Sequence, residues 1–249
     1  MKKDIFDEIV EHLRELQTQD KTTFIAPEVV NEFFTDTQAA SAPVQNQAPA
    51  TAGFSAEPVD PAIASMTLEE LNSTAQKCQK CPLCTNRKNV VFGEGSPNAD
   101  LMFIGEGPGY DEDQQGRPFV GKAGELLTKM ITAMQFTREQ VYIANIVKCR
   151  PPKNRNPLPE EAAACLPYLQ RQIELIQPKV IVILGAVPLK YLLNKTGITR
   201  LRGQWDSYNG IKVMPTFHPA YLLRDPKAKG VTWSDLQQVM KLFGKVHKN

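Results

Sequence analysis

The sequence predicts a three-layer α/β/α sandwich, in which helices cover both faces of a central, mainly parallel sheet of four to five strands. After about residue 76, short apolar runs alternate with segments of helical periodicity, which is typical of α/β domains. Several of these runs are almost continuously apolar, which indicates strands buried on both faces and hence a parallel sheet. The residues before this region differ in composition and predict a helical and disordered N-terminal extension.

The extension begins with an amphipathic segment, DIFDEIVEHLREL at 4–16, whose apolar residues recur at helical spacing. We expect this helix either to pack on itself or to recruit a protein partner through residues 4–34. A stretch rich in Ala, Pro, Gln and Ser follows, and no basic residue occurs between Lys21 and Lys77. Such a composition buries too little apolar surface to offset the entropy of ordering. The predicted organisation is a helical segment at 1–36, a flexible linker at 37–66 and a folded domain at 67–249.

The folded domain supplies strands and helices in alternation. Strands are expected at 89–95, 99–105, 140–148, 179–185 and 211–217. Helices are expected at 121–134, 159–176, 186–194 and 232–246, and Pro159 followed by two glutamates is a favourable helix start. Ligands of such sheets bind beyond the carboxyl ends of the strands. The loops of interest therefore follow Ile104, Ile143, Leu184 and Phe217.

Charge is distributed unevenly along the chain. Residues 1–75 contain 4 Lys and Arg against 13 acidic residues, and residues 76–249 contain 25 against 14. A basic body with an acidic extension indicates a protein that binds a polyanion such as DNA, although an ordinary basic domain would look similar. No apolar run approaches the roughly 18 residues of a membrane span. The acidic start lacks the apolar core of a signal peptide, so we expect a cytoplasmic protein without membrane contact. We also expect the protein to be a monomer.

Five cysteines suggest a metal site. The segment CQKCPLC at 78–84 contains two Cys-x-x-Cys pairs, and Cys149 and Cys165 lie far along the chain. Disulfides are uncommon in the cytoplasm, whereas four thiolates bind zinc or an iron–sulfur cluster. Zinc ribbons usually supply two close pairs, so the separation of Cys149 from Cys165 slightly favours a cluster. Taken alone, Cys165 could equally be a buried apolar thiol.

Three further features carry chemical groups to strand ends. The segment FIGEGPGYDEDQQGRPFVGKAGELL at 103–127 places glycines after a strand, where the backbone can approach a ligand closely. It matches neither a Walker loop nor a full dinucleotide fingerprint. Asn145 is polar in an apolar strand and needs a partner, either a ligand or a core group. His218 closes a strand in TFHPAYLLR and precedes an apolar wedge, Tyr221-Leu222-Leu223.

Together these features resemble the family 4 uracil-DNA glycosylases, the iron–sulfur branch of the uracil-DNA glycosylase superfamily. The resemblance covers about two thirds of the chain, from about Cys78 to Phe243, and excludes the first 75 residues. It is carried by CxxCPL at 78–83, VVFGEG at 90–95, GEGPGYDEDQQGRPFVGKAG at 105–124, NIVKCRPPKNRNP at 145–157, Cys165 and HPAYLLR at 218–224.

The resemblance implies a monofunctional enzyme that flips uracil out of DNA and hydrolyses its glycosidic bond, leaving an abasic site. Phe119 would stack on the base, and the Asn145 amide would read its polar edge. His218 would stabilise the negative charge on the leaving uracil, together with backbone N–H groups of the loop that contains Gly105 and Gly107.

The group that positions water is less well marked. Related enzymes use the Asp of a Gly-Gln-Asp-Pro-Tyr loop, and here Gly107 replaces that Asp, while Gly109 replaces the Tyr that blocks the thymine methyl group. Glu112 is the first candidate and Glu106 the second.

The resemblance also implies a structural [4Fe–4S] cluster on Cys78, Cys81, Cys149 and Cys165. Cys84 would be an extra thiol, although a pair of Cys81 and Cys84 has the same spacing as the first pair. DNA, single- or double-stranded, would be contacted through its phosphates and at the vacated stack. The expected DNA-binding residues are Lys122, Arg150, Lys153, Arg155, Tyr221 and Leu222.

Two rival hypotheses belong to other classes. A non-catalytic, cluster-containing DNA-binding module could be recruited to replication or repair machinery. A zinc-stabilised nucleotide-binding protein could use the GEGPG loop.

Overall fold

The structure is a computed structural model that describes residues 61–245. The predicted N-terminal helix and most of the predicted linker lie outside the described residues. The packed body reaches at least to the short helix α3 (Pro61–Ala64), where Ile63 is buried in the core. Folded structure therefore extends into residues for which the composition predicted a linker.

Six strands form one sheet within residues 61–245, in the order β1-β3-β2-β4-β6-β5. The four central strands are parallel, as predicted, and the two short edge strands run antiparallel to their neighbours. Strand β1 is much shorter than the predicted 89–95, and the polar strand β5 has no apolar run that could have predicted it. The bounds are β1 Glu94–Gly95, β2 Leu101–Gly105, β3 Tyr142–Asn145, β4 Val180–Leu184, β5 Asp206–Tyr208 and β6 Ile211–Thr216.

The four predicted helices are present, and the longest has the predicted bounds. They are α6 Lys122–Ala133, α7 Pro159–Ile176, α8 Ala186–Leu193 and α11 Ala228–Leu242. Six shorter helical segments were not predicted: α4 Leu68–Gln76, α5 Tyr110–Gln115, α9 Ile198–Leu201, α10 Pro219–Arg224 and the 3₁₀ turns η1 Pro82–Thr85 and η2 Pro152–Asn154. The capping box of Thr67 and Glu70 on α4 was a readable signal in the sequence.

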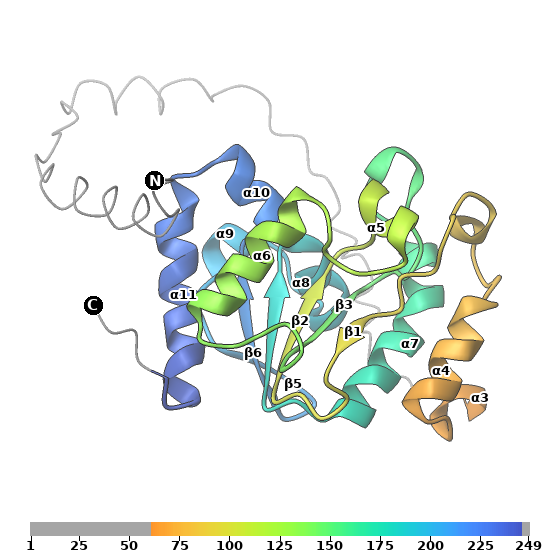
Figure 1. Cartoon of the computed structure of the whole chain (residues 1–249), viewed down its shortest axis with the longest axis horizontal. Coiled ribbons are helices and arrows are strands. Elements are labelled where there is room, and N and C mark those ends of the chain that lie inside the picture. The colour runs from red at the N-terminus through yellow and green to blue at the C-terminus, as the bar shows by residue number, and fades with distance from the viewer. Residues whose placement is uncertain (1–60, 246–249) are drawn as a thin grey trace, which may run out of the picture. The chain divides into compact units, whose positions relative to one another are not determined.

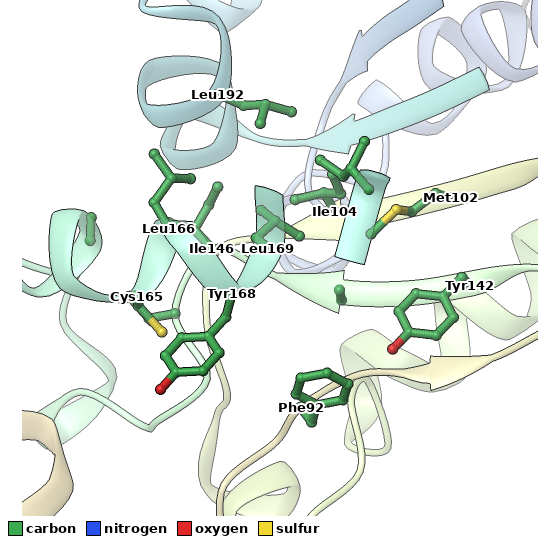
Figure 2. Packing of buried hydrophobic residues seen from close by; sticks show 14 of the residues in the cluster. Phe92, Met102, Ile104, Tyr142, Ile146, Cys165, Leu166, Tyr168, Leu169 and Leu192 are labelled. Carbon is green, nitrogen blue, oxygen red and sulfur yellow. The ribbon is translucent and has the colours of Figure 1, made fainter. Parts of the chain in front are cut away.

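Alternate side chains of each central strand enter two separate cores, which makes the fold a three-layer sandwich (Figure 1). On β2, Met102 and Ile104 face the core covered by α4, α7 and α8, while Leu101 and Phe103 face the core covered by α6, α10 and α11. Figure 2 shows the first core, with residues of α7 packed toward the sheet. The continuous apolar runs of the sequence are thus explained by burial on both faces.

The order in which the chain adds strands to the sheet reverses around β2. It passes from β2 through α6 to β3 on one side, and from β3 through α7 to β4 on the other side of β2. Helices α6 and α7 lie on opposite faces, so the chain leaves the carboxyl ends of the neighbouring strands β2 and β3 toward opposite faces of the sheet. A crevice at such a switch point is where open α/β sheets bind ligands.

Candidate functional site

A cavity of about 500 Å³ lies at the carboxyl ends of the central strands. Segments far apart in the sequence line it: the loop after β2, the end of β3, the η2 loop and the start of α10. It therefore unites six residues that the sequence singled out for catalysis or substrate binding: Glu106, Gly107, Glu112, Phe119, Asn145 and His218.

Asn145 ends β3 and is 1% exposed. Its Oδ1 atom has no hydrogen-bond partner anywhere in the described part of the chain. Gly105 is its register partner on β2, and a Cβ at position 105 would lie 2.5 Å from Asn145 Oδ1. A buried acceptor without a partner costs free energy unless a ligand supplies the donor. Asn145, at the end of β3, thus offers an unpaired hydrogen-bond acceptor to a ligand that enters the cavity.

Phe119 forms an aromatic wall of the cavity. Its ring lies 5.5 Å from the His218 ring, measured between centroids, and its backbone has a φ of +52°. The same Cβ at position 105 would lie 2.6 Å from Phe119 Cζ, so glycine is required for the ring to sit here. The ring can offer its face to a planar ligand.

His218 caps the N-terminus of α10. Its Nδ1 accepts a hydrogen bond of 3.1 Å from the backbone N–H of Ala220, which leaves the imidazole proton on Nε2. Burial, reinforced by the positive charge of Arg224, lowers the pKa of His218 to about 4. The neutral imidazole can therefore donate one hydrogen bond through Nε2 at neutral pH.

The two candidate carboxylates differ in their surroundings. Glu112 accepts hydrogen bonds from the backbone N–H groups of Gly109, Val120 and Gly121, at 3.1, 2.9 and 3.0 Å. These bonds close the N-terminus of α5 and join it to the loop after Phe119. Glu106 has no side-chain hydrogen bond or ion pair within residues 61–245, and burial raises the pKa of its carboxyl group. In this structure the Glu112 carboxylate therefore holds the two loops together.

The residues expected to bind DNA are partly dispersed. Lys122 and Tyr221 lie at the cavity and are exposed, whereas Arg155 lines it while holding the buried Glu161 at 2.7 and 2.8 Å. Arg150 and Lys153 do not line the cavity, and the Arg150 guanidinium stacks on Tyr110 at 5.1 Å.

The expected contact of Leu222 with DNA is wrong in this structure. Its side chain is 2% exposed and packs in the core between α10 and the sheet. Residues on one helix three or four positions apart share a face, but adjacent residues do not. Tyr221 and Leu223 are exposed at 37% and 46% and remain available as the wedge.

All five cysteines line a second, smaller cavity. Cys149 follows β3 and Cys165 lies on α7, so this cavity joins the loop after β3 to the helix. Three basic residues, Lys80, Arg87 and Lys148, line the same cavity, and the Arg87 guanidinium donates to Cys149 Sγ at 3.2 Å. Burial raises the pKa of Cys165 to about 12 and also raises the pKa of Cys149. Within residues 61–245, no three His, Cys, Asp or Glu side chains are close enough to hold a single metal ion.

The donor set nevertheless fits an anionic cluster. Four or more thiols from three segments surround one space, and N–H donors and positive charge face the sulfurs. Hydrogen bonds to sulfur are a feature of protein-bound iron–sulfur clusters.

Several residues of both sites were not predicted. Tyr110, Asn154, Asn156 and Arg224 line the larger cavity. Lys148 is fully buried, and its Nζ donates to the Asn145 backbone oxygen at 3.0 Å and to Gln172 Oε1 at 2.6 Å. A lysine at the end of an apolar strand and a glutamine on the inner face of a helix were the available signals.

Comparison with known proteins identifies the relatives of this chain. Residues 92–237 match the family described as the uracil DNA glycosylase superfamily. A type-4 uracil-DNA glycosylase of Thermotoga maritima is 53% identical over 161 residues, which cover 64% of this chain and 84% of that protein. Similar enzymes of Sulfurisphaera tokodaii and Archaeoglobus fulgidus are 46% and 40% identical, over 71% and 72% of this chain and 84% and 94% of those proteins.

Proposed function

Since the chain belongs to the uracil DNA glycosylase superfamily, and within it to the type-4 enzymes, we propose that the larger cavity carries out the removal of uracil from DNA and that the cysteine cavity supports the fold. The activity is hydrolysis of the N-glycosidic bond at the start of base excision repair. One observation carries the assignment to this cavity: the buried, unpartnered Asn145 Oδ1 lies in one cavity with the Phe119 ring and a neutral His218. A non-catalytic binding module would not require this set.

Uracil enters the cavity only after its nucleotide has rotated out of the stack. Its ring stacks on Phe119, and the Asn145 amide accepts from N3–H and donates to O4. Cytosine presents the reversed pattern and would leave buried polar groups unpaired, which makes its binding costly. The free Oδ1 atom supports this role because it lacks the donor that N3–H would supply.

His218 acts as a neutral electrophile. As the glycosidic bond breaks, negative charge develops on the uracil O2 atom, and the Nε2 proton of His218 donates to it. Backbone N–H groups of the loop after Gly105 assist. Donors that are already oriented stabilise such charge without reorganisation.

We propose that Glu106 orients the attacking water and that Glu112 holds the loops around it. Three backbone donors already occupy the carboxylate of Glu112. Glu106 lines the cavity without a protein partner among the described residues, and its raised pKa suits proton acceptance. This reverses the order of preference that the sequence suggested.

Type-4 uracil-DNA glycosylases carry a [4Fe–4S] cluster, and we propose that Cys78, Cys81, Cys149 and Cys165 would hold it in this chain. Its role would be structural, because hydrolysis moves no electrons. Cys84 would remain an extra thiol at the edge of the same space, so Cys84 in place of Cys78 is the competing ligand set.

DNA is the substrate, and the basic residues of the folded domain would bind it. Lys122 and Arg155 would contact phosphates beside the cavity, Arg150 and Lys153 would extend the contact, and Tyr221 with Leu223 would fill the vacated stack. We also propose that the chain acts as a monomer and that residues 4–34 bind a protein partner. No helix among the described residues is long and apolar enough to cross a membrane.

The test measures cleavage of a uracil-containing oligonucleotide after alkaline treatment of the abasic product. Asn145→Ala and His218→Ala should each lower the rate by about a hundredfold or more, as loss of a preorganised donor does. Asn72→Ala, an exposed amide on α4, serves as the matched control and should leave the rate unchanged. Activity indifferent to both site variants would remove this cavity from the mechanism. Binding of the oligonucleotide by cluster-loaded protein without any cleavage would favour the non-catalytic module.

A further inference from the structure

The base-stacking residue Phe119 has a backbone conformation that its own side chain disfavours. A φ of +52° lies in the left-handed region, where a bulky residue is rare and persists only if its surroundings hold it. The ring of Phe119 is aimed by this conformation, because φ and ψ set the direction of the Cα–Cβ bond. Some neighbouring group must therefore hold the two peptide planes on either side of its Cα atom.

Arg138 contacts both of these planes. Its Nη2 donates to the backbone oxygen of Pro118 at 2.8 Å, and its Nη1 donates to the backbone oxygen of Phe119 at 3.2 Å. The same Nη1 also donates to Thr128 Oγ1 on α6 at 3.1 Å. The planar guanidinium fork thus joins the loop to a rigid helix at fixed angles, which a flexible ammonium group could not do.

The surroundings of Arg138 keep it in place. Its side chain is 15% exposed, and its Nη2 lies 3.9 Å from a carboxylate oxygen of Glu94, which supplies a counter-charge. Glu94 also pairs with the exposed Arg117 through two contacts of 2.7 Å. On the far side of Phe119, Glu112 accepts from the N–H groups of Val120 and Gly121. The segment is therefore held from both ends.

We propose that Arg138 is a positioning residue for catalysis: it locks Phe119 in the left-handed conformation and so aims the ring at the flipped base. This inference rests on the proposed stacking role of Phe119. Arg138 lies outside the larger cavity and acts only through the two carbonyl groups.

A double-mutant cycle tests this coupling, with kcat/KM measured on a uracil-containing oligonucleotide for cluster-loaded, full-length protein. Arg138→Met should lower kcat/KM by about tenfold to a hundredfold, as small misplacements of positioning groups do. In a Phe119→Ala background, where no ring remains to be aimed, the same change should cost less than about twofold. Arg138→Lys should recover part of the loss, because one ammonium can still reach a carbonyl. Arg117→Met is the matched control, since it removes the other partner of Glu94, and it should leave kcat/KM unchanged.

The outcomes distinguish the stacking role of Phe119 from the positioning role of Arg138. If Phe119→Ala retains full activity, the stacking role fails and the inference falls with it. If Phe119→Ala is impaired but Arg138→Met is not, only the inference is overturned. The inference is also overturned if the kcat/KM losses of Arg138→Met and Phe119→Ala multiply fully in the double variant. Arg138 would then act independently of the Phe119 ring. Should Arg138→Met fail to fold, Arg138→Lys replaces it in the same cycle, with melting temperature as the check on folding.

Discussion

Gly105 and Asn145 are register partners at the carboxyl ends of neighbouring parallel strands, and the space that a side chain at 105 would fill is taken by the Asn145 amide and the Phe119 ring. The site is therefore built around the absence of a side chain. The Asn145 amide and the Phe119 ring can approach each other only because residue 105 has no Cβ.

Replacing Gly105 by alanine should damage the site. The new Cβ would lie 2.5 Å from Asn145 Oδ1 and 2.6 Å from Phe119 Cζ, so both groups must move. We expect kcat/KM to fall by at least about tenfold, with a loss of roughly 1–3 kcal/mol in the free energy of unfolding. Gly197→Ala is the control: its Cβ would meet nothing within 4 Å, yet its φ of +90° is strained. That variant should lose stability and keep its activity, whereas equal kinetic losses in both would contradict the steric argument.

The pKa of His218 should leave a signature in stability. The folded protein protonates His218 only near pH 4, while the unfolded chain does so near the ordinary pKa of 6.5. Proton uptake by the unfolded state alone should therefore lower the free energy of unfolding as the pH falls from about 6.5 to about 4. Urea denaturation across this range should show a smaller decrease for His218→Gln than for the unchanged protein. Identical pH dependences would contradict a neutral, buried imidazole.

The two glutamates should respond differently to neutralisation. Glu106→Gln should lower kcat by about a hundredfold and leave the melting temperature nearly unchanged, because it would remove the proposed water-orienting base, which holds no protein group among the described residues. Glu112→Gln should lower the melting temperature as well, since an amide cannot accept from all three N–H groups. Burial raises the pKa of Glu106, so the acid limb of the kcat profile should disappear in Glu106→Gln only. An acid limb that vanishes instead in Glu112→Gln would restore Glu112 as the water-positioning group.

The cysteines should divide into ligands and one bystander. Cys149→Ser and Cys78→Ser should abolish the visible sulfur-to-iron absorbance and lower the melting temperature, because the proposed cluster would join the loop after β3 to α7. Cys84→Ser should leave both the absorbance and the melting temperature unchanged. The opposite result for Cys78 and Cys84 would select the alternative ligand pair, and retained absorbance in Cys149→Ser would reject the ligand set.

Adjacent leucines on α10 should have opposite effects. Leu222→Ala should lower the free energy of unfolding by about 2–5 kcal/mol, because the residue is buried. Leu223→Ala should change stability by less than about 0.5 kcal/mol, as exposed substitutions usually do. It should nevertheless reduce activity on duplex DNA more than on single strands, since only a duplex has a stack to fill. Equal effects on both substrates would exclude Leu223 from the wedge.

The sequence by itself determined the layered architecture and the chemical types of the site. Continuous apolar runs such as VIVIL at 180–184 specify buried parallel strands, and the motifs around Phe119, Asn145 and His218 identify the family. The helix from Pro159 was predicted with its bounds because its start signal is local. Local signals were too weak for α5 and α10, whose N-termini depend on the hydrogen bonds that the Glu112 carboxylate and His218 Nδ1 accept from backbone N–H groups.

Only the tertiary structure decided what each of these groups is free to do. Glu106 and Glu112 look alike in the sequence, but distant backbone donors occupy one carboxylate and leave the other open to the cavity. Leu222 and Leu223 differ only in the side of α10 that meets the core. Arg138 bears no motif, yet it holds the loop that carries Phe119. Hydrogen-bond partners and burial arise from segments brought together by folding, and so the role of a side chain is settled by its neighbours in space.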